Sequence, residues 1–172
     1  ADALRAFELC GAAGIALRPS LLPFSPWGTL DDLVELFGLL EARGLLQHLD
    51  PVQLTVRLLV PPGSLLERDP GIDFLGLDRA ALPWRWRHPD PRMDALQPAL
   101  SAAAEEGARV DEPPLETTLR MRDLARSAAG LPPGAPPSAG PGQRRVPRLT
   151  ESWFCCAEPT CRQLAPLKQD GP

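Results

Sequence analysis

The chain has 172 residues, of which 44% are hydrophobic and 23% charged, and its formal net charge is −4. These fractions are typical of a globular protein with its own core and argue against wholesale disorder. The acidic balance and the lack of a dense Lys/Arg patch argue against nucleic acid or an anionic membrane as the partner. No apolar run reaches the roughly 18–20 residues that span a bilayer, and no signal peptide is evident.

Four cysteines are present, and three of them crowd near the C-terminus: Cys10, Cys155, Cys156 and Cys161. This spacing is not that of a disulfide-stapled secreted domain. We therefore predict a cytoplasmic protein with reduced or redox-active thiols. The sequence starts at Ala1 inside a helical pattern and without Met, so we expect it to be the C-terminal part of a longer protein.

The most regular patterns lie in residues 14–66 and predict a strand, a helix and a second strand. The first strand is expected at residues 15–22, where side chains alternate between two faces. The helix is expected to start after Thr29, an N-cap candidate with Asp32 three residues on, and to end at Gly44. The second strand is expected over residues 52–60, again with alternating apolar and polar side chains.

A helix that joins two strands through short loops favours a parallel, right-handed crossover. Because parallel strands are usually covered on both faces, the polar faces are expected to look into a barrel lumen. The residues expected on these polar faces are Arg18, Ser20, Gln53, Thr55 and Arg57. Either arginine can clamp a carboxylate or phosphate with its fork of donors, or instead cap a strand end or pair with an Asp. Ligand contact is favoured for Arg57 and left open for Arg18.

Later segments are predicted to be mostly helical, with helices at about residues 93–109 and 115–129. The apolar stripe expected for the second helix is Leu115, Met121, Leu124, Ala125 and Ala128. Pro98 is expected to be tolerated only in the first turn of its helix. Tryptophans and arginines alternate at residues 84–87 and can stack a nucleic-acid base, but two such arginines are thin support for that function. His48 and His88 lack partners at metal-ligand spacing and are expected to be structural.

A Pro/Gly-rich linker is predicted before the cysteine-bearing tail. In the tail, a disulfide between the neighbours Cys155 and Cys156 would close a strained, easily reduced ring that suits redox work. Cys161 can serve as a resolving thiol or a third metal ligand, although the spacing does not match paired C-x-x-C zinc motifs. Glu158 can accept a proton nearby. Cysteines carried by chance on a tail remain an equal alternative.

Two regions resemble a known family. The blocks LRPSLLPFSPWGTLDDL and LDPVQLTVRLLVPPGSLL resemble the later β/α units of radical S-adenosylmethionine (SAM) enzymes. The tail sequence ESWFCCAEPTC resembles the terminal signature of CUAEP/CCAEP-tail radical SAM proteins, in which the second residue of the pair is selenocysteine or cysteine, here Cys156. The family's C-x-x-x-C-x-x-C loop, which binds a [4Fe–4S] cluster, does not occur in this chain.

The resemblance implies an α/β fold, the C-terminal part of a radical SAM-type partial (β/α) TIM-like barrel. The barrel units would cover residues 1–68, a mostly helical extension residues 69–130, the linker residues 131–148 and the CCAEP tail residues 149–172. The complete enzyme would use the cluster and SAM to form a 5′-deoxyadenosyl radical, with an electron donor and an unknown small-molecule or peptide substrate as partners.

The resemblance also implies roles for individual residues. Those that would hold cofactor or substrate are Arg18, Ser20, Gln53, Thr55 and Arg57, and those of the catalytic tail are Cys155, Cys156 and Glu158. No metal ligands are expected within this chain, which alone is expected to be inactive. A non-catalytic thiol-tail module for metal or selenium, or an inactive remnant, is the alternative.

Overall fold

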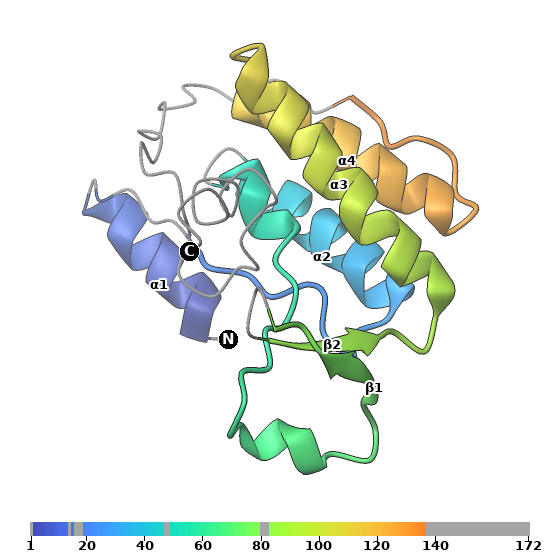
Figure 1. Cartoon of the computed structure of the whole chain (residues 1–172). Helices are drawn as coiled ribbons and strands as arrows, with labels where there is room; N and C mark the ends of the chain where they lie inside the picture. The colour runs from blue at the N-terminus through green and yellow to red at the C-terminus, as the bar shows by residue number, and fades with distance from the viewer. Residues whose placement is uncertain (1, 14, 16–18, 47–48, 80–82, 137–172) are drawn as a thin grey trace, which may run out of the picture.

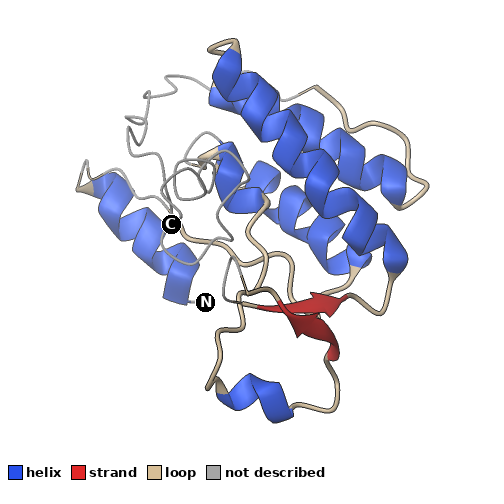
Figure 2. Ribbon diagram, viewed as in Figure 1, coloured by secondary structure: helices blue, strands red, loops and turns tan. Residues whose placement is uncertain are grey.

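The computed structural model describes residues 2–13, 15, 19–46, 49–79 and 83–136. Within this part, four α-helices and a two-stranded antiparallel sheet are connected by loops and short 3₁₀ turns (Figures 1 and 2). The helices and strands are α1 (Asp2–Ala12), α2 (Leu30–Ala42), β1 (Asp73–Leu77), β2 (Trp84–Arg87), α3 (Pro91–Arg109) and α4 (Pro114–Ala128). Helices α2, α3 and α4 lie together in Figure 1, whereas α1 stands to one side.

Helix α2 confirms the helix expected after Thr29. The Thr29 side chain accepts a hydrogen bond from the Asp32 backbone N–H, and the Asp32 carboxylate accepts one from the Thr29 N–H, which completes a capping box. At the other end, Gly44 has a φ of 64°, a left-handed conformation that glycine adopts without steric cost.

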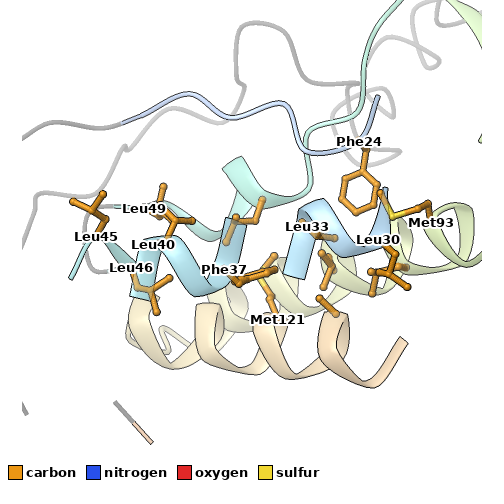
Figure 3. Close-up of a cluster of buried hydrophobic side chains, with 14 residues drawn as sticks. Phe24, Leu30, Leu33, Phe37, Leu40, Leu45, Leu46, Leu49, Met93 and Met121 are labelled. Atoms are coloured by element: carbon orange, nitrogen blue, oxygen red, sulfur yellow. The ribbon is translucent and has the colours of Figure 1, made fainter. Parts of the chain in front are cut away.

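The main hydrophobic core, which we call the helical core, lies between α2, α3 and α4 (Figure 3). Its buried side chains include Phe24, Leu30, Leu33, Phe37, Leu40, Leu54, Met93, Leu100 and Met121. Leu4 and Phe7 of α1 pack against it while remaining partly exposed. At the crossing of α3 and α4, Gly107 is buried and leaves room for Thr117.

Helices α3 and α4 confirm the two helices expected in the second half of the chain, with two corrections. Pro98 lies in the interior of α3 and not in its first turn. Its ring is on the exposed side, where water can hydrate the carbonyl that loses a helical N–H partner. Helix α4 buries Thr117, Thr118 and Arg122, whereas Leu124, expected in the buried stripe, is exposed.

The strand expected over residues 52–60 is wrong in its first half. Pro51–Leu54 forms a 3₁₀ turn, η2, because Asp50 caps its start through Val52 N–H and proline fixes φ at a helical value. Thr55 continues the turn by donating its hydroxyl to the Val52 carbonyl. As a result, the predicted alternation is absent here, and Thr55 is buried along with its two neighbours.

Within the described residues, the predicted strand pair shows one bridge, and its direction is parallel. Phe24 pairs with Arg57 in a parallel bridge, with Phe24 N–H donating to the Val56 carbonyl and Leu58 N–H to the Phe24 carbonyl. Residues 19–22 of the first expected strand form no ladder, and neither Pro19 nor Pro23, which follows the strand, has an N–H to donate. Residues 16–18 lie outside the described part of the chain. The barrel itself stays a prediction.

The β-hairpin was not expected from the sequence. Strands β1 and β2 pair antiparallel with a bulge between Phe74 and Gly76, and Val60 adds a bridge to Trp84. The hairpin buries a second cluster, which we call the hairpin cluster: Val60, Ile72 and Trp86, with Leu58, Leu66, Phe74 and Trp84 packed against them. The alternating tryptophans and arginines of β2 are thus a strand with one buried face, and this period-two pattern is the signal that predicts it.

Candidate functional site

Half of the predicted site residues lie in the described part of the chain. Ser20, Gln53, Thr55 and Arg57 are described, whereas Arg18, Cys155, Cys156 and Glu158 lie outside the described residues. His48 also lies outside them. The described geometry therefore concerns the predicted lumen residues and not the tail.

Gln53 and Thr55 use their polar atoms within the chain. The Gln53 Oε1 accepts a hydrogen bond from Leu21 N–H at 3.4 Å. The Thr55 carbonyl accepts one from Gln97 Nε2 of α3 at 3.0 Å, in addition to the bond from its hydroxyl to Val52. Ser20 is exposed. The bond from Leu21 N–H brings the segment that carries Ser20 next to Gln53. That these residues contact a ligand stays a prediction.

Arg57 is held from three directions. Its Nη1 donates to Asp94 Oδ1 at 2.8 Å, and its Nη2 donates to the Trp86 carbonyl at 2.7 Å. The guanidinium also stacks on the Trp86 indole, with Cζ 3.7 Å from the ring centroid. Its side chain is only 12% exposed. Of the two interpretations offered for Arg57, pairing with an Asp is the one seen in this geometry.

Asp94 and His88 extend this polar cluster to the starts of two helices. The second Asp94 oxygen accepts the His88 backbone N–H at 3.0 Å. Because the Asp90 N–H donates to His88 Nδ1 at 2.8 Å, the imidazole proton is assigned to Nε2, which donates to the Gly28 carbonyl at 2.7 Å. The buried His88 ring thus joins the loop before α2 to the loop before α3, a structural role as expected.

We call Arg57, Trp86, His88 and Asp94 the polar joint, because they connect the hairpin cluster to the helical core. Both oxygens of Asp94 and both ring nitrogens of His88 are in hydrogen bonds. These bonds fix the positions of the side chains and occupy the acceptor atoms of Asp94 and His88. The Arg57 guanidinium uses two of its five N–H groups in the bonds to Asp94 and Trp86.

A second charged cluster was missed by sequence reasoning. Arg122 of α4 is buried and donates to Glu41 of α2 and to its neighbour Asp123. The signal for it was available, since Arg122 follows Met121 and precedes Ala125 on the face that α4 buries. Arginines are usually assigned to the solvent side, and periodicity alone does not reveal a buried partner on α2.

Metal and membrane features were searched within the same described ranges. No three His, Cys, Asp or Glu side chains there come together in a group that could hold a metal ion. Cys10 on α1 is a free, half-buried thiol. Across the described helices, none is both long and apolar enough to cross a bilayer.

Comparison with known proteins finds no matching family model, no similar curated protein and no similar solved structure.

Proposed function

We propose that this chain is the C-terminal portion of a radical SAM enzyme with a redox-active cysteine pair in its tail. The observation that carries the proposal is the sequence ESWFCCAEPTC at residues 151–161. A disulfide between adjacent cysteines is strained and readily reduced, so it suits reversible redox chemistry more than structural cross-linking. Oxidation of Cys155 and Cys156 to a disulfide releases two electrons and two protons, which an electron carrier or an oxidised substrate group takes up.

The arrangement around α2 supports the proposal. In a β/α barrel, consecutive strands are parallel and a helix connects them. The parallel bridge between Phe24 and Arg57, with α2 between them in the chain, has this order and direction. In the part of the chain that the structure describes, this match is one bridge long.

The chain's own residues do not fit the iron–sulfur cluster that the family requires. Such a cluster needs three thiolates at C-x-x-x-C-x-x-C spacing, and Cys10 is isolated while the tail cysteines are spaced differently. In the proposal the cluster ligands belong to another part of the full-length protein. No step of the chemistry is assigned to the cluster within this chain.

The predicted contacts to cofactor or substrate remain proposals: Arg18, Ser20, Gln53, Thr55 and Arg57. Since Gln53, Thr55 and Arg57 bond within the chain, we propose that these three hold the segment between η2 and Val60 in place as a wall of the site. Ser20, which is exposed, is the described residue whose side chain is best placed for direct contact.

The full reading frame provides the test. The coding DNA upstream of Ala1 is expected to continue in frame and to encode C-x-x-x-C-x-x-C. The full-length protein, purified without oxygen, is expected to form 5′-deoxyadenosine from SAM and a reductant, and a Cys10→Ser variant is expected to do the same. The proposal would be contradicted by stop codons in the upstream frame, or by a full-length protein that holds the iron–sulfur cluster but does not cleave SAM.

The metal-binding alternative predicts a different result for the same tail. Three thiols at Cys155, Cys156 and Cys161 can bind a soft metal when deprotonated. Titration of the reduced chain with Zn²⁺ decides between the two functions, with Cys10→Ser as the control for the remaining thiol. Binding tighter than about micromolar that is lost in Cys156→Ser would favour the alternative.

A further inference from the structure

Arg122 is the most deeply buried charge on α4. The residue is 4% exposed, and its guanidinium contacts three separate segments. Nη1 donates to Glu41 of α2 at 2.6 Å and to the Ala135 carbonyl at 3.0 Å, while Nε donates to Asp123 at 3.0 Å. A single side chain thus connects α2, α4 and the chain that follows α4.

The chain after α4 turns back and runs antiparallel to the helix. Gly130, with a φ of 72°, forms the turn, and Leu131 N–H donates back to the Arg126 carbonyl. Arg126 then contacts the carbonyl of Pro132, Asp123 the amide of Gly134, and Arg122 the carbonyl of Ala135. As the residue numbers rise along this segment, those of their α4 partners fall. In Figure 1 the segment is the orange trace beside α4.

Gly134 leaves room for the guanidinium where this segment crosses Arg122. A Cβ at this position would overlap Arg122 Cζ, so the arginine side chain would have to shift. The Gly134 N–H donates to Asp123 Oδ1 at 3.0 Å. Partial burial alone would raise the pKa of Asp123, but the Gly134 amide and the Arg122 guanidinium together lower it. Asp123 is therefore the charged acceptor that holds the segment and the guanidinium at once.

We propose that residues 130–136 form a strap, anchored by Arg122 and Asp123, that fixes the position of Pro136, from which the chain continues toward the cysteine-bearing tail. A buried ion pair is weak support for stability alone, because apolar residues of similar volume do as well or better. The charges here instead select one path for a backbone whose prolines donate no hydrogen bonds. Specifying that path is the role we assign to the cluster.

The strap limits where the tail cysteines can go. From Pro136, the 155 position is at most about 65 Å away along a fully extended chain, at roughly 3.4 Å per residue. Release of the strap back to Gly130 would add about 20 Å to this limit. The importance of this distance limit for the thiol pair rests on the proposed function. The existence of the strap does not.

Amide exchange followed by NMR tests the strap on the intact chain. The Gly134 amide of the wild type is expected to exchange at least about tenfold more slowly than in an unstructured peptide. In Gly134→Ala this protection is expected to be lost, since the new methyl group collides with Arg122, while amides of α2 and α4 keep theirs. Gly38→Ala is the matched control, because a Cβ at Gly38 meets nothing within 4 Å.

Asp123→Ala is the second variant, and it removes the shared acceptor without adding volume. It is expected to speed exchange of Gly134 in the same way, with α4 still helical by circular dichroism. An unprotected amide at position 134 in the wild type, or a protected one in both variants, would overturn the strap. Neither result depends on SAM cleavage, so failure of the proposed function and failure of the strap are told apart.

Discussion

At the scale of single residues, two helical glycines show that the surroundings of a glycine determine the effect of adding a methyl group there. Gly107 of α3 faces α4 so closely that an added Cβ would overlap Thr117 Oγ1 and lie 3.1 Å from Glu112 Oε2. Thr117 cannot easily retreat, because it is buried and its hydroxyl donates to Glu112 at 2.6 Å. Gly38 of α2 is exposed and faces open space.

We expect the same substitution at these two glycines to have opposite effects. Gly107→Ala should lower the free energy of unfolding by about 1–2 kcal/mol, since overpacking of the helix crossing exceeds the gain in helix propensity. Gly38→Ala should raise it by up to about 1 kcal/mol. Urea denaturation of the three proteins measures both changes. A Gly107→Ala variant as stable as the wild type would contradict the close α3–α4 crossing.

At the scale of elements, the capping box of α2 links helix stability to pH. The Thr29 hydroxyl and then its backbone N–H lower the pKa of the Asp32 carboxyl, because both hydrogen-bond its charged form. A carboxyl with a depressed folded-state pKa stabilises the fold above its unfolded value, near 4, and this contribution is lost as the pH falls through the lower folded value.

Thr29→Ala is expected to destabilise the chain by about 1 kcal/mol at neutral pH, as is usual for the loss of an N-cap. The dependence of stability on pH between about 3 and 5 should also become shallower. Urea midpoints measured at several pH values test both effects. Thr29→Ser keeps the hydroxyl and is expected to behave like the wild type, and an equal loss in both variants would argue against the cap.

The elements that sequence patterns predicted best are those whose stabilising contacts are local. Helix α2 carries its start signal, apolar stripe and stop signal within its own residues, so it was predicted with its ends. The segment at Pro51–Leu54 has β-favouring residues, but the adjacent Asp50-Pro51 pair forms a capped turn that outweighs them. The pairing of β2 with β1 depends on residues outside β2, and the alternation of Trp and Arg in β2 taken alone is also typical of a base-stacking surface.

In the candidate site, too, contacts between residues distant in the sequence could not be predicted from local patterns. That Arg57 pairs with an Asp was one of the two stated interpretations, but its partner Asp94 is 37 residues away and no local signal identifies it. The Arg122 cluster brings together residues from α2, α4 and the strap, and was not predicted at all.

At the scale of the whole molecule, the polar joint holds two hydrophobic clusters together. Arg57 binds Trp86 of the hairpin cluster and Asp94 of α3, which contributes Met93 and Leu96 to the helical core. The two clusters have separate sets of buried side chains. Stability of the hairpin should therefore depend on Arg57 more than stability of the helices does.

Arg57→Met is expected to cost about 2 kcal/mol, the scale of charge-assisted hydrogen bonds, and to speed amide exchange in β1 and β2 more than in α2 to α4. Arg57→Lys should recover little, because an ammonium cannot bond Asp94 and Trp86 while stacking on the indole. Exposed Arg109, paired with Glu106, is the control, and Arg109→Ala should leave stability close to that of the wild type. Equal acceleration in all elements would contradict the joint.

The two isolated bridges also bear on which parts of this chain can change length. Phe24 pairs with Arg57 on one side of a short segment, and Trp84 pairs with Val60 on the other. An insertion between Arg57 and Val60 would shift one bridge relative to the other and turn buried side chains outward. An insertion at the exposed turn around Gly63 would leave both bridges as they are. Length variation among natural variants should accordingly avoid residues 57–60 and collect at that turn.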